Sequence, residues 1–189
     1  MPVRFLGGGG GGGGSTDVRG IIAAPTLTTV TATTETTTCV WAIPANYLLA
    51  KDSIFINLIG TIALAQTTNK PIYRVRIGTT GTTADTLLFT TMADGTTLYT
   101  SSANKQVIIE NLIYFPAIGS SGSCVSCGKV FNTNNTASSL FTQLTANNGT
   151  QQTNKTVDTT AILYVSISVF FAAAGNTFTP EVPFISFSL

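Results

Sequence analysis

Carboxylates are the side chains of this sequence best suited to acid–base chemistry, because the chain contains no histidine. The commonest general base and metal ligand is therefore missing, and the Ser-His-Asp and Cys-His catalytic arrangements are excluded. Two carboxylates at the right separation can still hydrolyse a glycosidic bond, so a glycan-cleaving enzyme is one hypothesis. Most of the acids stand beside predicted turns, where Asp hydrogen-bonds the backbone, and we predict neither enzymatic activity nor a cofactor. The eight acids are Asp17, Glu35, Asp52, Asp85, Asp94, Glu110, Asp158 and Glu181.

Three cysteines are present, and two of them, Cys124 and Cys127, form a Cys-x-x-Cys pair. In a redox enzyme such a pair opens a helix whose dipole lowers a thiol pKa, but here it lies in a predicted strand or turn between glycines. As a zinc site the pair is half a ligand set, and Cys39 supplies only a third ligand where four are usual. We expect unremarkable thiols and no metal; a labile disulfide and a metal site are the alternatives.

Basic residues number nine, are scattered along the chain, and leave a formal net charge of +1. Nucleic-acid binding requires a basic patch or stripe, so no nucleic-acid partner is predicted. Arg74 and Arg76 face outward in a predicted strand. Glu110 stands in the middle of another predicted strand, and we interpret it as a residue of an exposed face, paired across strands with Arg74 or Arg76.

Charged residues make up only 9% of the chain, while hydrophobic residues make up 43%. Ordinary soluble domains carry roughly 25% charged residues; here threonine, serine and asparagine take their place, and the β-branched threonines favour strands. The low net charge also favours association, because copies repel each other little. No apolar run approaches the roughly 20 residues of a membrane-spanning helix, and the first residues lack the apolar core of a secretory signal. We expect synthesis in a cytoplasm and no membrane partner.

Alternating apolar residues predict about eight or nine strands at intervals near ten residues, which is typical of an antiparallel β-sandwich or jelly roll. In Pro71–Gly78, the alternation places Tyr73, Val75 and Ile77 in the core. An edge strand is expected near 28–32, a bulge or bend at Gly60, and a hairpin between Leu87 and Tyr99. Other inward residues are predicted at Cys39, Trp41, Ile43, Ile54, Ile56, Leu58, Leu163, Val165, Ile167, Val169, Ile185, Phe187 and Leu189.

The first twenty residues differ from the rest of the sequence, because they contain a run of consecutive glycines. Glycine loses more backbone entropy on folding than any other residue and buries no side chain. We therefore divide the chain into a Gly-rich N-terminal arm at 1–20, a Thr-rich connector at 21–36 and a jelly-roll β-sandwich domain at 37–189. Residues predicted to serve as the attachment site of this arm are Pro2, Val3, Arg4, Phe5, Leu6, Gly7, Gly8, Gly9, Gly10, Gly11, Gly12, Gly13 and Gly14.

One segment resembles the opening of jelly-roll domains in virion proteins of tailed bacteriophages. In Cys39–Thr61, the turn Ile-Pro-Ala-Asn-Tyr-Leu at 43–48 leads to Asp52 and a long apolar stretch that reaches Gly60. The later Arg-Val-Arg-Ile-Gly at 74–78 and the closing apolar stretches are similar to the same pattern. The sequence departs from it at Lys51, where glycine is common in these proteins, and in its long Asn-rich loop.

The resemblance implies a β-sandwich that forms homotrimers and is displayed on the outer surface of a virion. Members of this family serve as head decoration or cement proteins, as head fibres, or as domains of tail fibres and spikes. A small domain with a distinct arm fits a capsid decoration protein that binds the major capsid protein or another virion protein. The alternative is a head-fibre or tail-fibre module that binds host surface glycans through uncharged polar loops such as 133–158.

Overall fold

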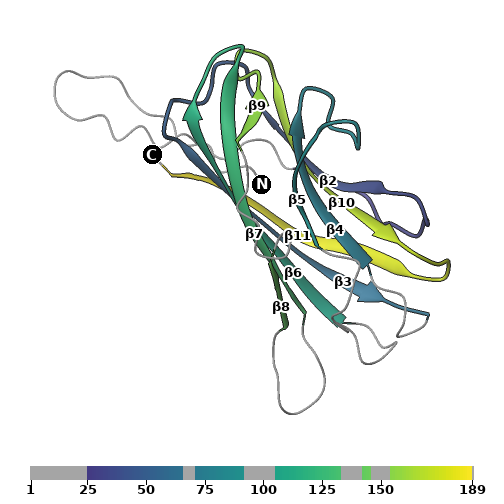
Figure 1. The fold of residues 1–189 in the computed structure, drawn as a ribbon. Helices are drawn as coiled ribbons and strands as arrows, with labels where there is room; N and C mark the ends of the chain where they lie inside the picture. The colour runs from purple at the N-terminus through teal and green to yellow at the C-terminus, as the bar shows by residue number, and fades with distance from the viewer. Residues whose placement is uncertain (1–24, 66–70, 92–104, 133–141, 146–153, 189) are drawn as a thin grey trace, which may run out of the picture.

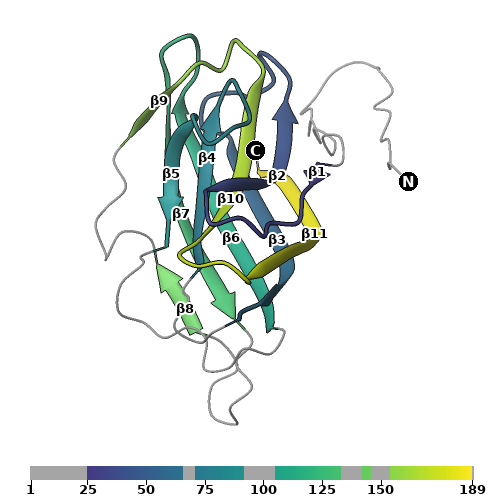
Figure 2. The same cartoon turned by 90° about the vertical axis from the view of Figure 1, so that its right-hand side faces the viewer.

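The computed structural model describes residues 25–65, 71–91, 105–132, 142–145 and 154–188, which form strands and no helix (Figures 1 and 2). Sheet A has the strand order β1-β2-β10-β4-β5, and sheet B has the order β11-β3-β6-β7-β8, with β9 also paired to β7. The strands are β1 (Thr26–Leu27), β2 (Thr36–Ile43), β3 (Ser53–Ala63), β4 (Pro71–Gly78), β5 (Thr86–Thr90), β6 (Lys105–Ala117), β7 (Gly122–Asn132), β8 (Thr142–Thr145), β9 (Lys155–Val157), β10 (Leu163–Phe171) and β11 (Thr177–Ser188).

The two sheets are antiparallel and pack face to face, so the β-sandwich prediction is confirmed (Figure 1). Strands β2, β3 and β4 alternate between the sheets, whereas β4 and β5 pair in sheet A and β6 and β7 pair in sheet B. The chain then returns to sheet A with β10 and to the edge of sheet B with β11. This strand order does not by itself establish the jelly-roll topology.

The core lies between the sheets and follows the predicted alternation of apolar side chains. All the predicted inward residues that the structure describes are buried, except that Phe187 is half-buried. Fully burying an aliphatic or aromatic side chain stabilises a fold by about 1.5–3 kcal/mol. Aromatic rings fill the largest volumes, and those of Tyr73 and Phe178 meet edge to face across the sandwich at 5.8 Å. The largest fully buried side chains are Trp41, Tyr73, Phe89, Phe115, Phe171 and Phe178.

The predicted edge strand at 28–32 is replaced by two separate contacts. Strand β1 pairs with β2 at residues 26–27, and Val30 forms a bridge with Phe178 of β11, with both N···O distances at 2.9 Å. Val30 is buried in the core. Residues 25–36 therefore leave the edge of sheet A, meet the edge of sheet B at Val30, and return to sheet A where β2 begins.

The bend expected at Gly60 is a bulge in the partner strand, between Pro180 and Val182 of β11. A Cβ atom on Gly60 would lie 2.6 Å from the ring of Phe178. Glycine is required here because β11 approaches the backbone of β3 so closely. Of the hairpin predicted between Leu87 and Tyr99, only its first half, β5, lies among the described residues.

Candidate functional site

The outer face of sheet B carries apolar side chains on four of the described strands. Side chains alternate along a strand, so every second residue of β3, β6, β7 and β11 points away from the core. The register aligns these residues in rows, for example Phe55 with Leu112 and Leu112 with Cys127. We define the outer face of sheet B as Phe55, Asn57, Ile59, Ile108, Glu110, Leu112, Tyr114, Val125, Cys127, Lys129, Phe131, Val182 and Phe184.

Several apolar side chains of this face remain open to solvent. The exposed fraction is 40% for Leu112, 49% for Phe184 and 54% for Val182. Phe55, Ile59 and Ile108 are half-buried. An exposed apolar patch rimmed by polar residues is typical of a surface that binds another molecule.

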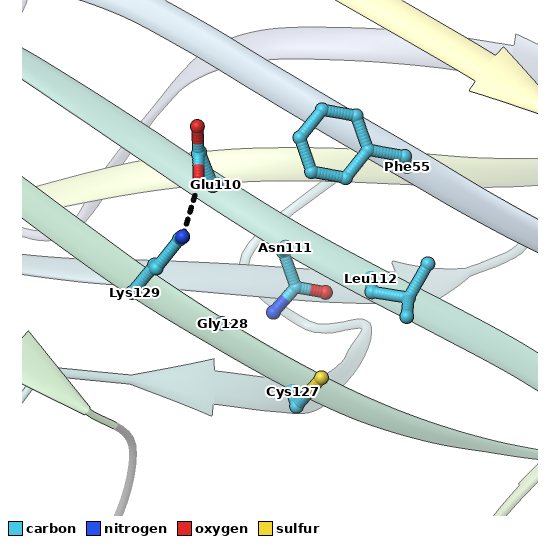
Figure 3. A pocket seen from close by; sticks show the side chains of 7 residues that line it. All are labelled: Phe55, Glu110, Asn111, Leu112, Cys127, Gly128 and Lys129. Atoms are coloured by element: carbon cyan, nitrogen blue, oxygen red, sulfur yellow. Dashed lines mark ion pairs between the residues drawn. The ribbon is translucent and has the colours of Figure 1, made fainter.

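A shallow depression of about 390 Å³ lies in this face between β3, β6 and β7 (Figure 3). Phe55 and Leu112 line its apolar side, and the Cys127 thiol lies at one margin. Gly128 presents only backbone to the depression, and on its inward side a Cβ would lie 2.4 Å from the amide nitrogen of the buried Asn111. The depression combines apolar contact with one ion pair, Glu110 with Lys129, at its other margin (Figure 3).

Glu110 is paired within its own sheet, so the pairing predicted with Arg74 or Arg76 is wrong. Its carboxylate lies 3.0 Å from the Nζ of Lys129 on β7 and accepts a hydrogen bond of 3.3 Å from Asn57 on β3. The two arginines belong to β4 of sheet A. The prediction failed because sequence alternation gives the face of a strand but not its neighbours.

The cysteines of the Cys-x-x-Cys pair lie on opposite faces of β7. Cys124 points into the core and Cys127 points outward, because positions three apart alternate in direction. Two such thiols cannot join in a disulfide or bind the same metal ion. Cys39 is buried as well, and burial raises the pKa of Cys39 and raises that of Cys124 to about 12.

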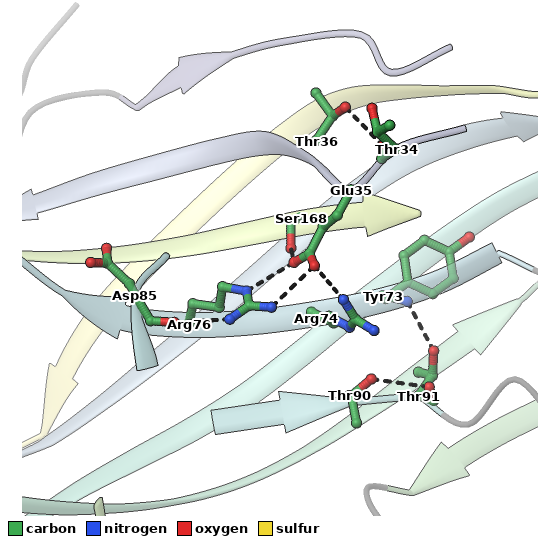
Figure 4. Close-up of polar contacts among 10 residues, drawn as sticks. All are labelled: Thr34, Glu35, Thr36, Tyr73, Arg74, Arg76, Asp85, Thr90, Thr91 and Ser168. Atoms are coloured by element: carbon green, nitrogen blue, oxygen red, sulfur yellow. Dashed lines mark hydrogen bonds and ion pairs between the residues drawn. The ribbon is translucent and has the colours of Figure 1, made fainter. Parts of the chain in front are cut away.

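The outer face of sheet A carries an ionic cluster around Glu35 (Figure 4). Arg76 donates two hydrogen bonds to the Glu35 carboxylate, at 2.8 and 3.1 Å, and Arg74 donates another. Ser168 of β10 donates to the same carboxylate at 2.6 Å. A third N–H of Arg76 reaches the carbonyl oxygen of Asp85 at 2.8 Å. The cluster fastens the segment before β2 across β10 and β4.

The pKa of Glu35 reflects these contacts. Burial opposes ionisation, but the hydrogen bonds from Arg76, Ser168 and Arg74 outweigh it and hold the pKa below its ordinary value. Glu35 therefore remains a carboxylate at neutral pH and serves as the centre of a structural network. Sequence reasoning placed Arg74 and Arg76 on the outer face of their strand but missed Glu35 as their partner.

A second depression, of about 310 Å³, lies at one end of the sandwich and is lined in part by Asp85 and Asp158. Asp85 accepts hydrogen bonds from Thr80 and Gly81, and Asp158 accepts two from Thr160. Asp52 similarly accepts a hydrogen bond of 2.7 Å from the backbone of Leu49. These contacts confirm the prediction that aspartates shape turns. Within the described ranges, no group of three or more acidic or cysteine side chains could hold a metal ion.

The residues predicted to attach the arm, 2–14, lie outside the described residues. The polar loop 133–158 is described only at 142–145 and 154–158, where β8 and β9 extend sheet B. Among the described residues, no helix has the length and hydropathy needed to cross a membrane. Comparison of the chain with protein-family models, curated proteins and solved structures finds no match.

Proposed function

We propose that the chain is a structural protein of a bacteriophage virion, a capsid decoration or cement protein that forms homotrimers. Its N-terminal arm binds the major capsid protein or another virion protein, and the sandwich is displayed on the outer surface. The observation that carries the proposal is the outer face of sheet B, because a broad apolar face with one ion pair suits assembly. The sequence resemblance and the low net charge support the same function.

The arm is tested by deleting residues 1–14 from the chain. Because the core residues of the sandwich lie outside this range, the truncated protein should fold as the full chain does. We expect it to lose binding to virus particles that lack this protein, measured by co-sedimentation. Retention of binding would contradict attachment through the arm. Hundreds of copies per virion would place the protein on the capsid, whereas a few to tens would place it on the tail or a fibre.

The depression around Phe55 favours a second candidate, a head-fibre or tail-fibre module that binds host surface glycans. An aromatic ring beside a carboxylate and an ammonium offers both apolar contact and hydrogen bonds to a sugar. A glycan array with the soluble full chain tests this candidate. Binding that is lost in Phe55→Ala and kept in Leu49→Ala, an exposed residue away from the depression, would support it.

A further inference from the structure

We propose that a second copy of this chain covers the outer face of sheet B. The inference rests on the self-association in the proposed function and assigns the surface that carries it. The apolar residues that remain exposed on this face come from the central strand β6 and the edge strand β11. Leu112, Val182 and Phe184 therefore extend from the centre of the face to one edge rather than lying at a single spot.

The size of the face matches what a specific protein contact needs. Its four long strands have 11, 13, 11 and 12 residues. At the usual strand spacing and rise per residue, they present a flat face of roughly 700 Å². Specific complexes bury roughly 800 Å² on each partner. A glycan or a short peptide would cover only part of this face.

The charges of the face suit a partner with the same charges. At its centre, Glu110 and Lys129 neutralise each other at 3.0 Å, and at the β11 edge the exposed Glu181 accepts a hydrogen bond from Thr61 of β3. The ammonium of Lys129 also lies 4.8 Å from the centre of the Phe131 ring. Faces of neighbouring copies, gathered around the axis of the trimer, therefore meet at their centres without like-charge repulsion, while the exposed Glu181 stays in water at the margin of the contact. A strongly charged partner would gain little electrostatic binding energy on this face.

The sheet edges are poor alternatives for self-association. Strand β1 has two residues, β8 has four and β5 has five. Strand β11 carries Pro180, Pro183 and a bulge, and Val30 already occupies a position on its outer side. Short strands, prolines and bulges protect edges against pairing with another chain. Association through the face is therefore favoured over strand addition.

The test uses the full-length protein and places a lysine on the face. In Phe184→Lys, an unpaired ammonium would be desolvated in the contact, and we expect self-association to weaken at least about 100-fold. Val182→Lys is the second variant, should Phe184→Lys fail to fold. Ile162→Lys is the matched control, because Ile162 has the same exposed fraction of 49% and lies outside the face. Sedimentation gives the mass, and circular dichroism and thermal unfolding check the fold.

The reactivity of the Cys127 thiol provides an independent measurement of the same contact. Cys127 is the exposed thiol, whereas Cys39 and Cys124 are buried. We expect iodoacetamide to modify Cys127 slowly in the wild-type oligomer and at least about 10-fold faster in Phe184→Lys. Cys127→Ser should show no fast-reacting thiol.

The outcomes separate this inference from the proposed function. Folded lysine variants with the wild-type mass, or an oligomer whose Cys127 reacts as fast as in Phe184→Lys, would overturn the assigned surface. A monomeric wild-type protein would overturn it as well. A wild-type oligomer with a stoichiometry other than three, dissociated by Phe184→Lys, would support the surface and contradict the trimer. Loss of particle binding after deletion of residues 1–14 concerns the arm alone.

Discussion

The outer face of sheet A is crossed by the chain itself, whereas the outer face of sheet B is not covered by any described segment. On sheet A, Thr28 is hydrogen-bonded to Thr38 of β2, and Glu35 lies over β10 and β4, where its cluster holds the chain before β2 (Figure 4). The outward polar residues of sheet A, Ser166 and Ser168 on β10, are consequently buried. On sheet B, outward apolar residues such as Leu112 and Phe184 stay exposed.

The two outer faces therefore serve different properties: the face of sheet A contributes to the stability of the single chain, and the face of sheet B to association between chains. On sheet A, Glu35, Arg74, Arg76 and Ser168 bind one another within a single chain, so that face contributes to folding. The exposed apolar side chains on the outer face of sheet B add little to the folding stability of a single chain. They lose contact with water only when another molecule covers them. Substitutions on the two faces should therefore change different properties, and the following experiments test that distinction.

The largest effect is expected for Arg76→Ala on the covered face. The substitution removes two hydrogen bonds to Glu35 and one to Asp85, and it leaves a partly buried carboxylate with fewer partners. We expect the free energy of unfolding to fall by about 2–3 kcal/mol, measured by urea denaturation at low protein concentration.

Lys129→Ala on the open face is the matched control for Arg76→Ala. Its ion pair with Glu110 is more exposed, and we expect a loss below about 1 kcal/mol. Equal losses for the two variants would contradict the distinction between the faces.

An intermediate effect is expected for Glu35→Gln, and it should depend on pH. Folding lowers the pKa of Glu35 relative to the unfolded chain, where it is about 4.3. The stabilisation is therefore fully present above the unfolded pKa and is lost as the pH falls through the lower folded pKa. At pH 7 we expect Glu35→Gln to cost about 1–2 kcal/mol.

The pH dependence is measured by urea denaturation of both proteins from pH 7 to about pH 3. The difference in unfolding free energy between wild type and Glu35→Gln should shrink toward the acid end. A difference that stays constant over this range would show that ionised Glu35 does not stabilise the covered face.

The smallest effect on folding is expected for Leu112→Thr on the open face. Leu112 is exposed, and threonine is a good strand residue, so the unfolding free energy of the monomer should change by about 0.5 kcal/mol or less. The same variant should weaken self-association, measured by sedimentation. A large loss of stability with unchanged association would reverse the roles assigned to the two faces.

Local alternation explains which expectations succeeded. The buried Tyr73, Val75 and Ile77 follow from a period of two, which any strand imposes on its own side chains. The turn at Pro44–Asn46 follows from residues that end a strand, and Asn46 adopts a positive φ of 57° there. Such features depend on neighbours in the sequence, so the sequence alone suffices to predict them.

Expectations about partners failed where the partner is distant. Glu110 pairs with Lys129 because β6 and β7 are neighbours, and Arg74 pairs with Glu35 because residues before β2 cross sheet A. The first pairing depends on the order of strands in sheet B, and the second depends on where a segment outside the strands crosses sheet A. The cysteine pair shows the opposite case, because strand alternation alone already places Cys124 and Cys127 on opposite faces.

The sequence by itself determined an all-β chain, the direction of most side chains along each strand, and the low charge that permits copies to approach. Tertiary structure alone decided which outer face is covered. Ser168 and Glu35 are 133 residues apart, yet their hydrogen bond helps to fasten the segment that covers sheet A. The alternation of side chains along a strand is fixed by local backbone geometry, whereas the covering of a sheet face depends on where segments distant in the sequence cross that sheet. The open face of sheet B is therefore a property of the folded chain.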